Sequence, residues 1–88
     1  MKARNMIIMR RGYAPAKDIA DATGKVLSTI HRLAEANKFV FVRDGRALYV
    51  RLDSVEAYFR REGLGMLADA VKKVAAGVQK EAAEAEKA

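Results

Sequence analysis

The 88-residue sequence contains no cysteine and no tryptophan, and His31 is its only histidine. Without cysteine the chain cannot form a disulfide framework, a thiolate zinc site or a cysteine nucleophile. A single histidine excludes a metal site built from several imidazoles. Long hydrophobic runs are also lacking, because the apolar run over 6–9 is too short for a spanning helix or a signal-peptide core. We therefore expect a small soluble protein of the cytoplasm, or of the nucleoid in a prokaryote, with no membrane partner and no cofactor.

Positive charge is concentrated in the first part of the chain. The whole sequence has 17 Lys and Arg against 11 Asp and Glu, a formal net charge of +6. Residues 1–52 carry eleven bases and four acids, a net of +7, whereas residues 53–88 carry six bases and seven acids, a net of −1. This segregation points to a polyanionic partner for residues 1–52, and a solvated basic surface is the alternative.

Residues 14–37 have the pattern of two short helices joined by a tight turn. Pro15 suits the first turn of a helix, where its missing N–H costs nothing. Gly24 suits the left-handed conformation that ends a helix. A second helix is predicted over 26–37, with its apolar residues on one face. That face consists of Val26, Ile30, Leu33 and Ala34.

Residues 38–52 have the pattern of a β-hairpin. The segments 39–42 and 47–50 are rich in β-forming residues, and Asp44-Gly45 between them predicts a two-residue type I′ turn. This turn would set Arg43 opposite Arg46 and Val42 opposite Ala47. Because like charges opposite each other in a hairpin are unfavourable, the arginine pair suggests that an anion binds there.

The last third of the chain is predicted to be helical. Asp53 and Glu56 have the spacing of a capping box, and the helix that they begin is expected to end near Gly63 or Gly65. A final helix follows, whose tail over 80–88 is expected to fray. Its apolar seam has coiled-coil-like spacing and consists of Leu67, Val71, Val74 and Val78. The seam could cover the thin core of its own domain or pair with a second copy, and we favour a homodimer.

The order of two helices, a two-stranded ribbon and a third helix is that of a winged helix-turn-helix. Roughly half of the chain, from Tyr13 to Phe59, resembles the excisionase and MerR-like family of small phage and plasmid proteins. The resembling stretches are Ala16–Ala20, Ser28–Leu33, Asp44–Arg46 and Leu52–Phe59. Lys25 departs from the pattern, since an apolar residue commonly follows the turn glycine, and Val26 is expected to take over its packing role.

The resemblance implies a mainly helical α+β fold with a two-stranded wing and a C-terminal helical extension. We expect a DNA-binding domain over residues 1–62 and an oligomerisation helix over residues 63–88. The resemblance also implies sequence-specific binding of double-stranded DNA, with a role in transcription control, excision or genome packaging.

The residues themselves support contacts to DNA. On the second predicted helix, Arg32 can donate two hydrogen bonds to guanine. Ser28, Thr29 and His31 share its exposed face and can reach bases or phosphates. The basic side chains suited to contact phosphates or the adjacent minor groove are Lys17, Lys25, Arg43 and Arg46.

No constellation of catalytic residues stands out. The sequence lacks a phosphate loop with Gly-Lys-Ser/Thr, and capping explains its best-placed carboxylates. We therefore expect a non-enzymatic DNA-binding protein, either a small transcriptional regulator or an excisionase-like recombination accessory. The alternatives are an assembly module resembling a phage terminase small subunit and a winged helix that recognises a protein.

Overall fold

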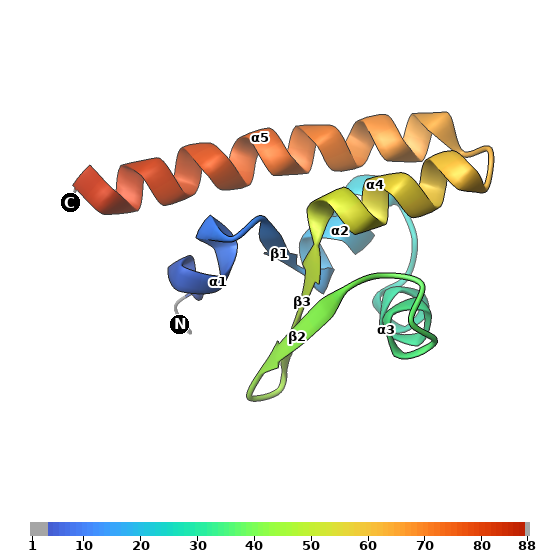
Figure 1. Cartoon of the computed structure of the whole chain (residues 1–88), viewed down its shortest axis with the longest axis horizontal. Helices are drawn as coiled ribbons and strands as arrows, with labels where there is room; N and C mark the ends of the chain where they lie inside the picture. The colour runs from blue at the N-terminus through green and yellow to red at the C-terminus, as the bar shows by residue number, and fades with distance from the viewer. Residues whose placement is uncertain (1–3, 88) are drawn as a thin grey trace.

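The computed structural model describes residues 4–87, and for Lys87 the backbone only. Over this range the chain forms five helices and one antiparallel sheet, arranged beneath the longest helix (Figure 1). The elements in chain order are α1 (Met6–Arg10), β1 (Tyr13–Pro15), α2 (Ala16–Thr23), α3 (Leu27–Glu35), β2 (Phe41–Asp44), β3 (Ala47–Arg51), α4 (Leu52–Arg61) and α5 (Gly65–Lys87). This small, mainly helical α+β fold is compatible with a winged helix.

The sheet has three strands in the order β1-β3-β2, so the predicted two-stranded ribbon is part of a larger sheet. β1 runs antiparallel to β3, with Ala14 opposite Val50. Pro15 ends β1 and caps α2 with φ −56°, so the predicted first helical turn begins one residue later. A proline has no N–H to give to a ladder, and it is tolerated here because the strand ends at it.

The connection between α2 and α3 confirms one local prediction and corrects another. Gly24 has φ 73° and its N–H donates to the carbonyl of Ala20, as expected for a left-handed helix end. Val26 does not pack, since it caps α3 in an extended conformation and is 64% exposed. Ile30 and Ala34 are fully buried and anchor α3. α3 ends at Glu35, before the expected end at residue 37.

The hairpin turn lies one residue further along the chain than predicted. Asp44 pairs with Ala47 and Arg43 with Leu48, so Arg43 and Arg46 do not face each other. Of the two turn residues only Gly45 has positive φ, at 62°, which fits a type II′ turn rather than the predicted type I′. Asp44 stays in the strand, where its carboxylate accepts a hydrogen bond from the side chain of Asn5 at 3.1 Å.

The predicted capping box at the start of α4 is wrong. The helix already includes Leu52, whose side chain is buried and whose N–H donates to the carbonyl of Gly12 at 2.8 Å. Asp53 therefore lies inside the first turn and pairs with Arg51, while Glu56 pairs with Arg60. Ser54 instead braces the entry to the helix, because its hydroxyl donates to the Arg51 carbonyl and accepts from the N–H of Val40.

α5 packs on its own domain, against α4, α2 and α1. Val71 and Val78 are buried in the one hydrophobic core of the described chain, and Leu67 and Val74 pack against it. The residues of the predicted dimer seam thus pack in or against the core of their own chain. Among the helices that the structure describes, none has both the length and the apolar character that crossing a membrane requires.

α5 extends to Lys87, through most of the tail that is predicted to fray, and Ala88 lies outside the described residues. Ala82 is buried, and two ion pairs join this end to the beginning of the chain. Glu81 lies 2.8 Å from Arg4, and Glu86 lies 3.0 Å from Arg10. These contacts connect the polar, alanine-rich end of α5 to α1 and to the segment before it.

Candidate nucleic-acid interface

α3 presents a polar face away from the core. One side of the helix is committed to packing through Ile30 and Ala34, which leaves the opposite side to solvent. Ser28 and Arg32 are exposed, whereas Thr29 and His31 are half-buried. A shallow depression runs along the face and is lined by Leu27, Ser28, His31, Arg32 and Glu35. The structure thus brings three of the four predicted residues of this helix together, and Thr29 lies outside the depression.

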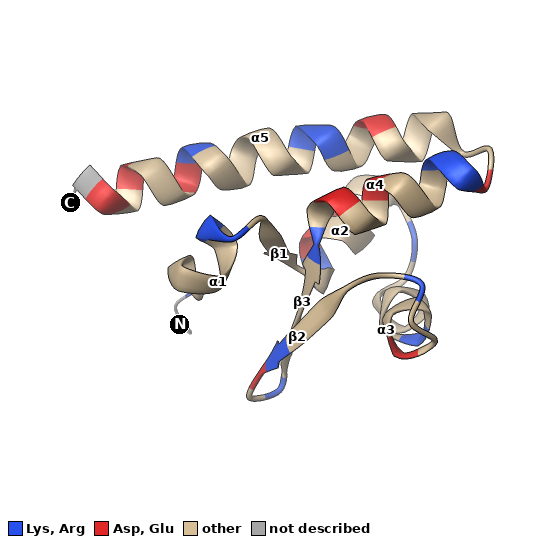
Figure 2. Cartoon of the chain, in the orientation of Figure 1, with Lys and Arg blue, Asp and Glu red and all other residues tan. Residues whose placement is uncertain are grey.

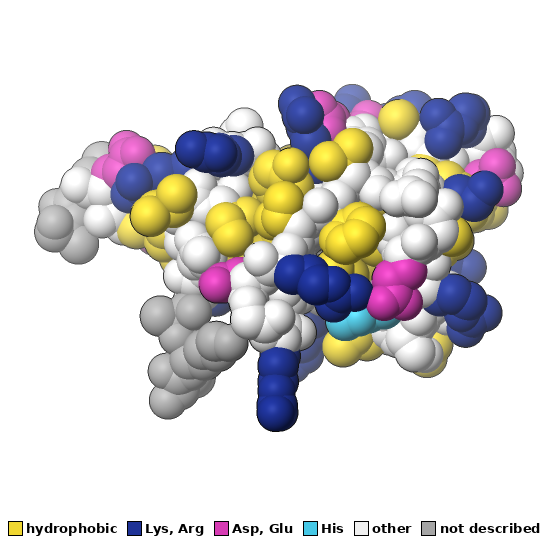
Figure 3. Space-filling view, turned by 60° about the horizontal axis from the view of Figure 1, so that its bottom comes forward, with side chains coloured by type: hydrophobic (Ala, Val, Ile, Leu, Met, Phe, Trp, Pro, Cys, Tyr) yellow, Lys and Arg dark blue, Asp and Glu magenta, His cyan; other side chains and the backbone are white. Residues whose placement is uncertain are grey.

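α3 and the hairpin turn lie on the side of the molecule opposite α5 (Figure 1). Seen from that side, basic, acidic and hydrophobic side chains lie beside the histidine, and a basic side chain protrudes from the molecule (Figure 3). Arg46 occupies the second position of the turn and is exposed. Lys25 lies exposed in the connection before α3, and Lys17 is exposed on α2. Within residues 4–87, the chain forms no ion pair through Lys17, Lys25, Arg32 or Arg46.

Arg43 differs from these basic residues because it already has an acidic partner. Its Nη2 atom donates to Oε2 of Glu35 on α3 at 2.8 Å, and its guanidinium carbon lies 5.8 Å from the ring centre of Phe41. Arg43 therefore connects β2 to α3 rather than standing free for a phosphate. Sequence reasoning missed this role of Glu35, because the pairing depends on how the hairpin lies against the helix.

Most arginines outside this face are paired with acids. Figure 2 shows basic and acidic residues interspersed along α4 and α5. Arg4 contacts Asp18 at 2.7 Å, and this hydrogen bond raises the pKa of Arg4 above its usual value, against the opposing effect of burial. Arg60 contacts Glu56 and Asp69, and hydrogen bonds to both carboxylates raise its pKa. The acidic partners offset the positive charge around α4 and α5. Positive net charge is therefore concentrated at the unpaired basic side chains of α3, the preceding turn and the hairpin.

The base of the hairpin is braced by the first described residues. The backbone N–H of Asn5 donates to the hydroxyl of Tyr49 at 2.9 Å, and its side-chain amide donates to Asp44. The Asn5 carbonyl oxygen of the side chain also accepts from the N–H of Ile8 and so caps α1. Tyr49 is buried, and the partner of its hydroxyl comes from a segment 44 residues away. Both strands of the hairpin are therefore hydrogen-bonded to Asn5.

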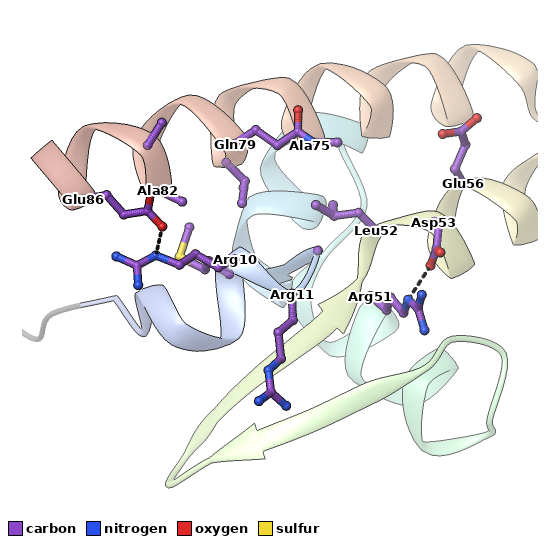
Figure 4. A pocket seen from close by; sticks show the side chains of 14 residues that line it. Arg10, Arg11, Arg51, Leu52, Asp53, Glu56, Ala75, Gln79, Ala82 and Glu86 are labelled. Carbon is purple, nitrogen blue, oxygen red and sulfur yellow. Dashed lines mark ion pairs between the residues drawn. The ribbon is translucent and has the colours of Figure 1, made fainter.

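A groove of about 480 Å³ lies on another side, between α1, the start of α4 and α5 (Figure 4). Its arginines are largely neutralised, since Arg10 pairs with Glu86 and Arg51 pairs with Asp53. Bases and acids balance along its rim, so it has little of the one-sided charge that marks the α3 face. Among the described residues no group of three or more His, Asp or Glu side chains could hold a metal ion.

No family model, no curated protein and no solved structure matches the chain. The site is therefore defined by its own residues. It consists of the solvent-exposed face of α3, with the basic side chains of Lys17 and Lys25 nearby. Next to it lies the hairpin, which carries Arg46 at its turn.

Proposed function

We propose that the chain is a non-enzymatic protein that binds double-stranded DNA in the manner of a winged helix. The observation that carries this proposal is the joint exposure of Arg32 on α3 and Arg46 on the hairpin turn, on the side opposite α5. Neither has an acidic partner within the described residues. Two unpaired cations on one side of the molecule attract a polyanionic partner more strongly than an uncharged partner.

α3 is suited to read bases. An α-helix fits the major groove of B-DNA, and the side chains on the face that enters the groove meet the base edges. Arg32 can donate two hydrogen bonds to the O6 and N7 atoms of guanine, which is the commonest specific contact. Ser28 and His31 lie beside it in the same depression and can reach neighbouring bases or the sugar-phosphate backbone.

The hairpin and the turn before α3 are suited to hold the backbone. Arg46 projects from a turn whose base is fixed by Asn5, so its guanidinium can reach a phosphate or the adjacent minor groove. Lys25 and Lys17 carry exposed ammonium groups that favour phosphates. These contacts position the protein without reading sequence, so they govern affinity and its dependence on salt.

The phage-packaging alternative has weaker support. It relies on α5 to join copies, and the seam of Leu67, Val71, Val74 and Val78 packs in or against the core of its own chain, whereas Met66 on the same helix is 87% exposed. A role in transcription control or excision requires only that the α3 face reach DNA. We therefore propose a small regulator or excisionase-like accessory.

The test is selection of bound duplexes from a random pool, followed by fluorescence anisotropy of the enriched duplex at several salt concentrations. We expect one enriched sequence and an affinity whose logarithm falls linearly with the logarithm of salt, with a slope near the number of phosphates neutralised. Enrichment of no sequence would limit the proposal to non-specific binding. Absence of binding even at low salt would reject it.

A further inference from the structure

Two consecutive apolar side chains are exposed at the start of α3. Val26 caps the helix and is 64% exposed, and Leu27 begins it and is 42% exposed. Leu27 lines the same depression as Ser28 and Arg32, so it lies beside the residues proposed to read bases. The core of the chain does not use it, because the packing face of α3 begins at Ile30.

The surroundings of Leu27 indicate what could cover it. Lys25 lies two residues before it and Arg32 five residues after it, both exposed and without an acidic partner within residues 4–87. An apolar protein partner would have to bury or neutralise these two cations. The major groove of DNA instead combines flanking phosphates with one apolar group on its base edges, the 5-methyl group of thymine.

We infer that Leu27 contacts a thymine methyl group and makes thymine part of the recognised sequence. This inference rests on the proposed function and adds a named base to it. Leu27 and Arg32 are five residues apart, which is about 7.5 Å along a helix and roughly two base steps of DNA. The thymine is therefore expected within about two base pairs of the guanine that Arg32 would contact.

The experiment removes the methyl group without changing base pairing. The enriched duplex is prepared with thymine and again with deoxyuridine, and the dissociation constant of each is measured for the wild type and for Leu27→Ala. The wild type is expected to bind the thymine duplex about fourfold more tightly for each methyl group that it buries. Leu27→Ala is expected to bind the two duplexes equally.

The ratio of the two dissociation constants is taken within one protein preparation, so a partly unfolded variant does not distort it. Leu64→Ala is the matched control, because Leu64 is 40% exposed but precedes α5, away from α3. This control should keep the fourfold preference. Equal binding of both duplexes by the wild type, or an undiminished preference in Leu27→Ala, would overturn the inference while leaving DNA binding intact. Failure of the wild type to bind any duplex would instead reject the proposed function, and the inference with it.

Discussion

Arg43 on β2 and Glu35 on α3 are joined by an ion pair of 2.8 Å, which ties the hairpin to the helix. Both side chains are about half exposed, so the pair contributes little to the stability of folding, on the order of 1 kcal/mol or less. The pair links two elements of the proposed DNA surface, and it occupies the Arg43 guanidinium that a phosphate would otherwise contact.

Replacing Glu35 by Gln is expected to strengthen binding to all duplexes. The change removes a negative charge from the proposed interface and releases Arg43 for a phosphate. We expect a gain of about 0.5–1 kcal/mol in binding free energy and a salt slope steeper by about one. Glu56→Gln is the matched control, since it makes the same change of net charge and also breaks an arginine pair, but on α4. Equal effects of the two variants on the salt dependence would contradict this role for Glu35.

The substitutions Arg32→Ala and Arg46→Ala are expected to weaken DNA binding in different ways. Arg32→Ala should cost about 1–3 kcal/mol on the enriched duplex and relax the base preference at one position. Arg46→Ala should weaken binding to all duplexes alike and lower the salt slope by about one. Binding to the enriched duplex and to a scrambled duplex over a salt series separates the two effects. Arg61→Ala, at the end of α4, is the control and should leave both quantities unchanged.

Val71→Ala is expected to destabilise the fold of a single chain. Val71 is fully buried against its own domain, so removing two methyl groups should lower the free energy of unfolding by about 2 kcal/mol. The exposed neighbour Lys72 should tolerate alanine within about 0.5 kcal/mol. Urea unfolding followed at several protein concentrations tests both points. A midpoint that rises with protein concentration, together with a variant that stays folded as a monomer, would contradict this role and favour a dimer that pairs through α5.

Replacing glycine by alanine is expected to change the free energy of unfolding in opposite directions at Gly24 and Gly77. Gly24 has φ 73°, a conformation that costs an alanine about 1–2 kcal/mol even though its Cβ would meet open space. Gly77 lies inside α5 with equal space for a Cβ, and alanine there should stabilise the helix by about 0.5–1 kcal/mol. Thermal unfolding of the two variants measures the difference. Stabilisation by both substitutions would show that the turn at Gly24 can change its conformation.

The sequence predicts the structure correctly where that structure depends on residues that are close together along the chain. The left-handed end of α2 at Gly24 and the buried face of α3 at Ile30 and Ala34 follow from spacing alone. The hairpin was found, but its turn was misplaced by one residue, because glycine can take either central position depending on the turn type. In the structure Asp44 lies in the strand and accepts a hydrogen bond from Asn5, a contact 39 residues away that turn chemistry alone does not predict.

Long-range contacts account for the remaining errors. β1 is three residues long and has no recognisable pattern until β3 lies beside it. The seam of α5 has the same apolar spacing whether it meets a second copy or its own core, so its partner could not be inferred from periodicity. In the candidate interface, exposure on α3 followed from the helical pattern, whereas the link between Arg43 and Glu35 required the fold.

The position of α5 in the core has a consequence for biosynthesis. A nascent chain emerges with its N-terminal part first, at about 5–20 residues per second. Until Val71 and Val78 have left the ribosome, the surfaces of α1, α2 and α4 that they cover remain open to water. The ion pair of Arg4 with Glu81 likewise joins the beginning of the described chain to its last helix. The domain therefore completes its folding only after α5 has been synthesised, and a stalled shorter chain would present an uncovered apolar surface to chaperones and proteases.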